Sequence, residues 1–122
     1  MNTLQSTIEN AWNDRALLKE ETTLNTIKEV IALLDEGKLR VAEPIEKGWQ
    51  VNEWVKKAVV MYFPIQKMET HEVGIFEYHD KMALKTGYAE KGIRVVPPAV
   101  ARYGAYISSG VILMPSYVNI GA

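Results

Sequence analysis

The sequence predicts an α+β fold, in which a helical N-terminal domain is followed by the first turns of a parallel β-helix. Two observations predict this fold. Apolar residues recur at helical spacing through most of the first 65 residues. From residue 95 onward, apolar or small residues recur every six residues, among prolines and glycines too dense for a helix. We expect an α-rich domain at 1–92 and an incomplete β-helix at 93–122.

Amphipathic patterns near the N-terminus predict the first two helices. The apolar face of the first helix is formed by Leu4, Ile8, Ala11 and Trp12. The longer apolar stripe of the second helix is formed by Leu24, Ile27, Val30, Ile31 and Leu34. We expect Thr22 or Thr23 to cap the N-terminus of this second helix. Asp35 should face water, and Gly37 should end the helix in the left-handed conformation that glycine tolerates.

Two short strands and a third helix follow. The stretches LRVAE at 39–43 and GWQV at 48–51 are typical of strands joined by a turn. The apolar residues of the helix after Asn52 are Trp54, Val55, Ala58, Val59, Tyr62 and Phe63. This wide apolar face predicts a largely buried helix, which Pro64 should end. Residues 65–92 give a weaker pattern, with a candidate strand in IFEYHDKM.

The six-residue pattern starts at Val95. Its first position holds Val95, Ala101, Ile107, Leu113 and Asn119, and its fifth position holds Ala99, Ala105, Val111 and Tyr117. In a parallel β-helix each hexad forms one flat side of a coil, and we expect the first-position side chain to point inward. Tyr117 is bulky for a corner and Asn119 is polar for an interior. A few irregular strands with chance spacing are the alternative.

The pattern runs to the end of the sequence. Residues 95–122 hold between four and five hexads, about one and a half turns of a three-sided coil. Repeat folds need stacked neighbours and a cap over their apolar end. We therefore expect this chain to be the front part of a longer protein that continues as a solenoid after Ala122.

Charge and composition limit the classes of function. The net charge is -1, from 14 basic and 15 acidic residues, which predicts neither nucleic-acid nor membrane binding. The sequence has no cysteine, which excludes disulfides and a cysteine nucleophile. The first residues do not resemble a secretory signal, and no apolar run approaches the roughly 20 residues of a membrane span. We expect a cytoplasmic protein.

The two histidines are candidate metal ligands. His71 and His79 lie eight residues apart, and Glu72, Glu77 and Asp80 lie nearby. This spacing is not one that zinc sites use, so we expect no metal.

Several stretches resemble the tetrahydrodipicolinate N-succinyltransferase family. The run GIRVVPPAVARYGAYISSGVILMPSYVNIGA is similar to the segment that enters the β-helix of that family, and RVVPPA followed by MPSYVNIGA is specific to it. LLDEGKLRVAEP and WVKKAVVMYF resemble the N-terminal domain of the family. The resemblance covers nearly the whole chain and is weakest around residues 65–90.

The resemblance implies the N-terminal part of an acyltransferase of lysine and diaminopimelate biosynthesis. Members transfer a succinyl group from succinyl-CoA to the amine of ring-opened tetrahydrodipicolinate. They are homotrimers of left-handed β-helices, with active sites between subunits. The family implies no tightly bound cofactor, and succinyl-CoA acts as a co-substrate. It places an aspartate that acts on the substrate, and the thioester site, beyond Ala122, so we expect the 122-residue chain alone to be inactive.

Four residues are candidates for substrate binding. A planar guanidinium matches a carboxylate, and Arg94 stands where the family has a substrate-binding arginine. Without the resemblance, a surface arginine is the simpler interpretation of Arg94. Arg102 should point outward, toward a groove or solvent, and is a candidate partner for the second carboxylate. Ser116 and Tyr117 offer hydroxyl groups that either line the pocket or order the turn. We expect Asn119 to hydrogen-bond the backbone, and we find no catalytic base among these residues.

Two other interpretations remain open at this stage. The chain is a non-catalytic helical interaction module, or it belongs to another hexapeptide acyltransferase, such as a serine acetyltransferase, which also places helices before its β-helix.

Overall fold

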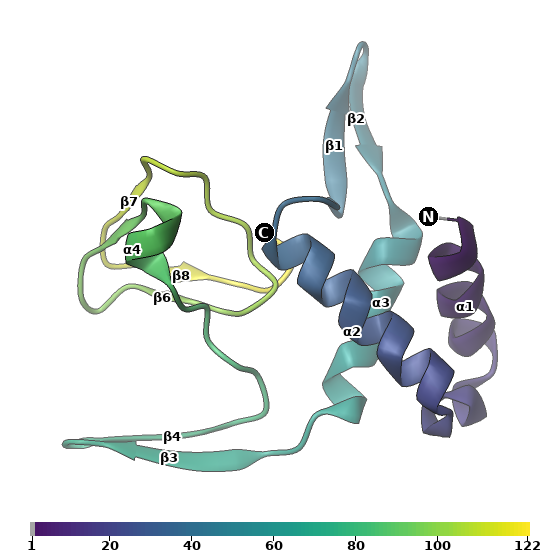
Figure 1. Ribbon diagram of the computed structural model, residues 1–122, viewed down its shortest axis with the longest axis horizontal. Helices are drawn as coiled ribbons and strands as arrows, with labels where there is room; N and C mark the ends of the chain where they lie inside the picture. The colour runs from purple at the N-terminus through teal and green to yellow at the C-terminus, as the bar shows by residue number, and fades with distance from the viewer. Residues whose placement is uncertain (1) are drawn as a thin grey trace.

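The computed structural model describes residues 2–122 as an α+β chain, in which helices stand beside a coil of short strands (Figure 1). The helices of the first part are α1 (Asn2–Asn13), the 3-10 helix η1 (Arg15–Lys19), α2 (Glu21–Asp35) and α3 (Glu53–Ile65). Two hairpins are formed by β1 (Ala42–Ile45) with β2 (Gly48–Val51), and by β3 (Glu69–Val73) with β4 (Phe76–Asp80). The coil contains α4 (Tyr88–Lys91), β5 (Arg94–Val95), β6 (Val100–Ala101), β7 (Ile112–Leu113) and β8 (Tyr117–Val118).

The three long helices pack on one another and bury the predicted apolar faces. From α2, Ile27, Val30 and Ile31 are completely buried. The other helices contribute the buried residues Ile8, Ala11, Val55, Ala58, Met61 and Tyr62. The three predicted helices are therefore confirmed, although α3 ends at Ile65, one residue after the expected stop.

The start of α2 differs from the prediction. The helix begins at Glu21, with Glu20 in the cap position and no capping bond from its side chain. Thr22 and Thr23 lie inside the first turn, and Thr23 is only 4% exposed. An N-cap bond contributes about 1 kcal/mol. Burial of Thr23 competes with that bond, and here burial prevails.

The end of α2 is the one that was predicted. Gly37 adopts a left-handed conformation with φ of 75°. Its N–H donates to the carbonyl of Leu34, and the N–H of Lys38 donates to the carbonyl of Leu33. These two bonds form a Schellman motif, which satisfies carbonyls that the helix end would otherwise leave unpaired.

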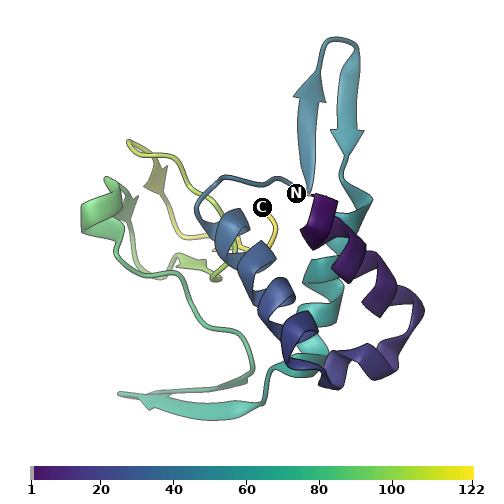
Figure 2. The ribbon, with the colours of Figure 1, turned by 45° about the vertical axis from the view of Figure 1, so that its right-hand side comes forward.

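Both hairpins project away from the helices (Figures 1 and 2). The first strand begins at Ala42 instead of Leu39, because Leu39 and Val41 pack against the helical core. The candidate strand in IFEYHDKM is confirmed as β4. Its partner β3 was not predicted, because ETHEV has a single apolar residue to reveal an alternation.

The coil strands pair in parallel. Arg94 on β5 lies opposite Ile112 on β7, eighteen residues later, and Val100 on β6 lies opposite Tyr117 on β8, seventeen residues later. Eighteen residues are three hexads, the length expected for one turn of a three-sided coil. Each strand is two residues long, and residues 2–122 do not form a closed solenoid.

The interior of the coil confirms most of the six-residue pattern. A small apolar cluster contains Ile93, Val95, Ala101, Ile107, Val111, Leu113 and Val118. The inward position expected for Asn119 is wrong, because Val118 lies opposite Ala101 and Asn119 is exposed. Val95 and Val100 are five residues apart, whereas their partners Leu113 and Tyr117 are four residues apart. This extra residue, at the Pro97–Pro98 corner, shifts the register by one.

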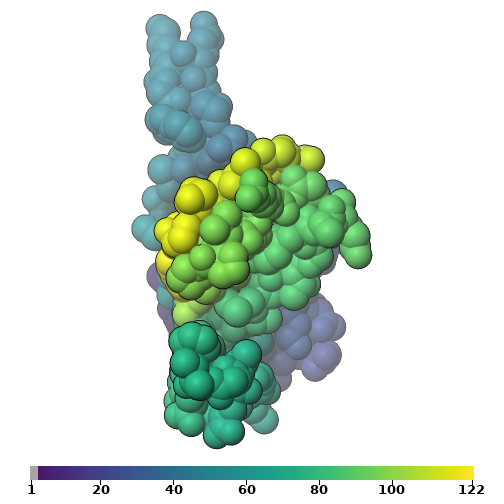
Figure 3. All heavy atoms as spheres, turned by 90° about the vertical axis from the view of Figure 1, so that its left-hand side faces the viewer, coloured from purple at the N-terminus to yellow at the C-terminus, as the bar shows by residue number. Residues whose placement is uncertain are grey.

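The coil also contacts the helical region. Ile120 is 8% exposed and belongs to the helical core, and Tyr103 packs against it. Figure 3 shows the face of the coil that lies opposite the helices, with the two hairpins extending above and below it.

Candidate functional site

Arg102 lies where the coil meets the base of β4. Its Nη2 donates to Asp80 Oδ2 at 3.1 Å, and its Nη1 donates to Asn119 Oδ1 at 3.2 Å. The guanidinium carbon lies 5.6 Å from the ring centre of Phe63 and 5.9 Å from that of Tyr117. The Arg102 side chain is 17% exposed. Two hydrogen bonds and two neighbouring aromatic rings therefore restrain this guanidinium.

Asp80 carries the matching charge. A hydrogen bond from the backbone N–H of Lys81 lowers the pKa of Asp80, and the nearby Arg102 lowers it further. Desolvation acts in the opposite direction without overcoming these effects. Asp80 is therefore ionised at neutral pH and neutralises Arg102. A role for Arg102 at a substrate carboxylate stays a prediction, and it would require the guanidinium to share or exchange this partner.

Asn119 and Tyr117 complete this cluster. Asn119 Oδ1 accepts a hydrogen bond from the N–H of Ile120 at 2.9 Å, which is the backbone contact that we expected of this side chain. The Tyr117 hydroxyl donates to the same oxygen at 3.4 Å. Tyr117 is 58% exposed, and its ring lies beside the Arg102 guanidinium.

The other two candidate residues lie elsewhere on the coil. Arg94 is exposed on β5, where its N–H donates to the carbonyl of Val111 at 3.1 Å. Ser116 is also exposed, and its hydroxyl donates to the carbonyl of Met114 at 2.6 Å. The structure thus brings Arg102 and Tyr117 together and places Arg94 on a different two-stranded sheet.

A buried ion pair was missed by the sequence analysis. Lys85 Nζ donates to Asp35 Oδ1 at 2.8 Å, and the N–H of Gly104 donates to the same oxygen at 2.9 Å. The side chains of Lys85 and Asp35 are 1% and 11% exposed. The expectation that Asp35 faces water is therefore wrong. Its position beside exposed Glu36 suggested a solvated helix end, and the weak pattern of residues 65–92 gave no sign of the partner.

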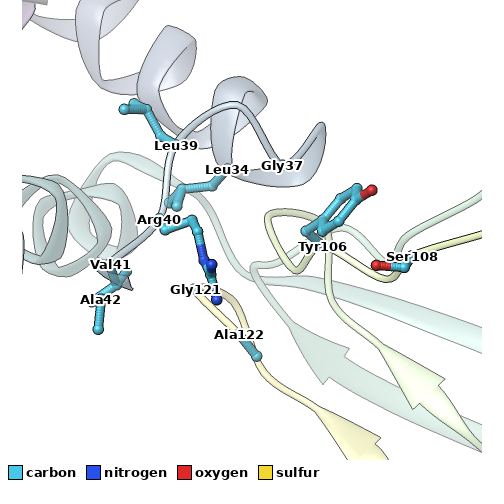
Figure 4. Close-up of a pocket in the computed structure, with 10 residues that line it drawn as sticks. All are labelled: Leu34, Gly37, Leu39, Arg40, Val41, Ala42, Tyr106, Ser108, Gly121 and Ala122. Atoms are coloured by element: carbon cyan, nitrogen blue, oxygen red, sulfur yellow. The ribbon is translucent and has the colours of Figure 1, made fainter. Parts of the chain in front are cut away.

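A pocket of about 560 Å³ lies between the loop after α2 and the end of the described coil (Figure 4). Arg40 extends into it toward Gly121, while Tyr106 and Ser108 line the opposite side. The remaining wall is formed by Leu34, Gly37, Leu39, Val41, Ala42 and Ala122. None of the predicted binding residues lines this pocket.

The histidines do not converge. His71 and His79 occupy neighbouring cross-strand positions and therefore lie on opposite faces of the β3–β4 hairpin. His79 Nδ1 is hydrogen-bonded to the Thr70 hydroxyl at 2.7 Å, and His71 lies 3.5 Å from Glu69. Within residues 2–122, no three histidine, aspartate or glutamate side chains gather as metal ligands would. In the same range, no helix is long and apolar enough to cross a membrane.

Comparison with known proteins identifies the class to which this helical region belongs. Residues 3–65, from the start of α1 to the end of α3, match the family described as Tetrahydrodipicolinate N-succinyltransferase N-terminal. The chain therefore belongs to this family, and the resemblance found in the sequence is confirmed. The matching family is the one that the sequence resembled, and it is not a serine acetyltransferase family.

Curated relatives give the same result over nearly the whole chain. The chain is 47% identical to the 2,3,4,5-tetrahydropyridine-2,6-dicarboxylate N-succinyltransferase of Bordetella petrii, across 97% of its length. It is 48% identical to the enzyme of that name from Cupriavidus metallidurans, across 97% of its length, and 46% identical to that of Aromatoleum aromaticum, across all of it. The chain spans about half of these relatives, 47% of the first two and 48% of the third.

Proposed function

We propose that this chain is the N-terminal part of an enzyme that transfers a succinyl group from succinyl-CoA to tetrahydrodipicolinate, in lysine and diaminopimelate biosynthesis. The observation that carries the proposal is the identity of 46–48% with N-succinyltransferases, which extends from the helical region through the coil. The match to the family along α1–α3 supports it independently.

The architecture of the whole enzyme is part of the proposal. We infer that residues 93–122 begin a left-handed parallel β-helix and that residues 1–92 form a separate substrate domain. The parallel pairing of β5 with β7 at an offset of eighteen residues supports the β-helix. A homotrimer and a cytoplasmic location follow from the family resemblance.

Arg94 is the best candidate for a substrate carboxylate in this part of the chain. Its side chain is exposed, and no ion pair or side-chain hydrogen bond within residues 2–122 engages its guanidinium. It is therefore free to form two parallel charge-assisted bonds with a carboxylate. Ser116 and Tyr117 are exposed, but their hydroxyls already donate to the carbonyl of Met114 and to Asn119 Oδ1, so each must exchange that partner to bind the dicarboxylate. Arg102 is a weaker candidate, because Asp80 already neutralises it.

The reaction itself needs groups that we place beyond residue 122. The substrate amine attacks the thioester carbonyl, the amine loses a proton, and the coenzyme A thiolate leaves. A base must take the proton, and hydrogen-bond donors must stabilise the developing oxyanion. We assign to the chain described here the recognition of the dicarboxylate, and to the remainder the base and the succinyl-CoA site. The chain alone should then show no succinyl transfer.

Two measurements on the full-length protein test the proposal. The first follows the release of coenzyme A thiol from succinyl-CoA when 2-aminopimelate is added as acceptor. We expect acceptor-dependent release, and its absence would contradict the proposed reaction. Purified residues 1–122 serve as the inactive comparison.

The second measurement is calorimetric titration with 2-aminopimelate. Arg94→Ala should weaken binding by roughly 2–5 kcal/mol, because it removes one partner of a desolvated charge pair. Arg94→Lys keeps the charge but lacks the planar guanidinium, so its affinity should lie between those of the parent and of Arg94→Ala. Arg15→Ala, an exposed arginine in η1, is the control that should bind normally. Unchanged affinity in Arg94→Ala would remove this residue from the site.

A further inference from the structure

The buried ion pair joins three separate parts of the chain. Asp35 lies at the end of α2, Lys85 lies in the segment that leads to the coil, and Gly104 lies in the coil itself. Lys85 Nζ donates to both the carboxylate and the carbonyl of Asp35, at 2.8 and 3.0 Å. Gly104 donates its N–H to the same carboxylate oxygen at 2.9 Å. One almost fully buried carboxylate, that of Asp35, therefore connects α2, the segment of Lys85 and the coil.

Backbone bonds extend this junction to both sides of Arg102. The N–H of Lys85 donates to the carbonyl of Ala101, and the N–H of Tyr103 donates to the carbonyl of Ala83, each at 2.9 Å. Arg102 lies between these two bonds, and its own N–H donates to the coil strand above. The segment that carries Lys85 is therefore hydrogen-bonded to the backbone on both sides of Arg102.

The apolar contacts between coil and helices are less directional. From the coil, Ile120 and Tyr103 join the helical core. The backbone approaches closely at Gly104, where a Cβ would lie 2.7 Å from Ile120 Cγ1 and 3.1 Å from Ile31 Cγ2. Hydrophobic burial is roughly proportional to area and tolerates small rotations. Hydrogen bonds to a buried charge do not tolerate such rotations, because a buried charge that loses its partners is costly.

We propose that the Lys85–Asp35 ion pair selects the single way in which the coil docks on the helical region, and that it thereby positions Arg102 beside Asp80. The two residues are positioning residues, and their role is independent of the proposed acyl transfer. The competing interpretation is that the pair only adds stability. Replacing a buried ion pair by neutral groups of similar volume is often neutral or stabilising, whereas removing one partner is costly. A double variant therefore distinguishes selection of the docked form from stability.

The test compares Lys85→Met, Asp35→Asn and the double variant in the full-length protein. Asparagine keeps an acceptor for the Gly104 N–H, and methionine keeps most of the lysine volume. Lys85→Met should lower the melting midpoint by about 10 °C or more, because it leaves Asp35 charged and buried. The double variant should recover most of that loss.

Hydrogen exchange gives the decisive measurement. In the double variant, the amides of Tyr103 and Gly104 should exchange at least about tenfold faster, and the NMR signal of Arg102 Nε–H should shift or broaden. A matched control is Glu36→Gln with Lys38→Met, which removes an exposed ion pair beside the same helix end and should change neither signal. A double variant that keeps both signals of the parent would overturn the proposal. So would one that does not fold, because the pair would then supply stability and select nothing.

Discussion

The ring of Tyr106 lies against the backbone of Gly37, so closely that a Cβ at residue 37 would stand 2.7 Å from ring atoms Cδ1 and Cε1. This contact joins the C-terminal end of α2 to the coil. Gly37 also has a φ of 75°, which strains any residue with a Cβ. Two separate physical reasons therefore require glycine at this position.

Gly37→Ala should destabilise the chain by about 2 kcal/mol, of which about half is backbone strain and the rest displacement of the Tyr106 ring. Gly110→Ala is the matched control, because Gly110 has a φ of 88° and open space where its Cβ would stand. Gly110→Ala should lose only the stability that backbone strain accounts for. Urea denaturation midpoints of the two variants measure the difference. Equal losses would show that the ring contact has no cost, and adding Tyr106→Ala to Gly37→Ala should remove the excess.

The coil interior can be tested with a pair of isoleucines. Ile107 is 8% exposed inside the coil cluster, whereas Ile112 is 54% exposed on β7. Ile107→Ala should lower the free energy of unfolding by about 2–4 kcal/mol, through lost burial and a cavity. Ile112→Ala should change it by less than about 1 kcal/mol. Similar losses in chemical denaturation would contradict the inward and outward assignment along the six-residue pattern.

The Asp80–Arg102 pair predicts a dependence of stability on pH. The folded state holds the pKa of Asp80 below its ordinary value of 3.8. The contribution of ionised Asp80 to the free energy of unfolding is therefore complete above pH 3.8. It is lost as the pH falls through the lower pKa of the folded state. The difference in unfolding free energy between parent and Asp80→Asn should be constant above about pH 5 and should shrink below pH 4. Because the Asp80 side chain is 43% exposed, we expect a difference below about 1 kcal/mol.

A carboxyl carbon titration by NMR can separate the effect of Arg102 on the pKa of Asp80 from that of the backbone N–H groups of Lys81 and Met82. In Arg102→Met, the titration midpoint of Asp80 should rise but stay below 3.8, because the N–H of Lys81 still donates to it. A midpoint that does not move would show that Arg102 contributes nothing to it.

A half-buried ion pair connects α1 to α3. Lys57 Nζ donates to Glu9 Oε2 at 2.8 Å and lies 5.8 Å from the ring centre of Trp12. Lys57→Met should cost about 0.5–1 kcal/mol in low salt, and part of this loss should disappear in about 1 M sodium chloride because salt screens the attraction. Lys56→Met, at the exposed neighbouring position, should change the melting midpoint little at either ionic strength. A loss of stability that is the same at both salt concentrations would show that packing, not the ion pair, is responsible.

Local patterns predicted most of the elements. The buried stripe of α2 and the left-handed Gly37 were readable because helical periodicity and glycine chemistry act over a few residues. Strand β3 was not readable, because its side chains are all exposed and leave no alternation of burial. The cap at Thr22 or Thr23 was wrong because packing of Thr23 competes with a local preference of similar size.

The sequence predicted some residues of the candidate site, but not which residues lie next to one another. Arg102 and Tyr117 were singled out, and they do lie together. Asp80, which holds Arg102 from the hairpin, was considered only as a metal ligand, because nothing local links residues 80 and 102. The inward place of Asn119 failed because one extra residue at a distant corner changed the register.

By itself, the sequence determined the helices, the six-residue repeat of the coil and the family, since each is expressed in residue types at short, regular spacing. The tertiary structure alone decided that Asp35 and Lys85 pair in the interior, fifty residues apart, and that Arg102 meets Asp80. These contacts depend on how the coil docks against the helices. That docking depends on contacts between residues far apart in the chain, and such contacts leave no periodic signal in the sequence.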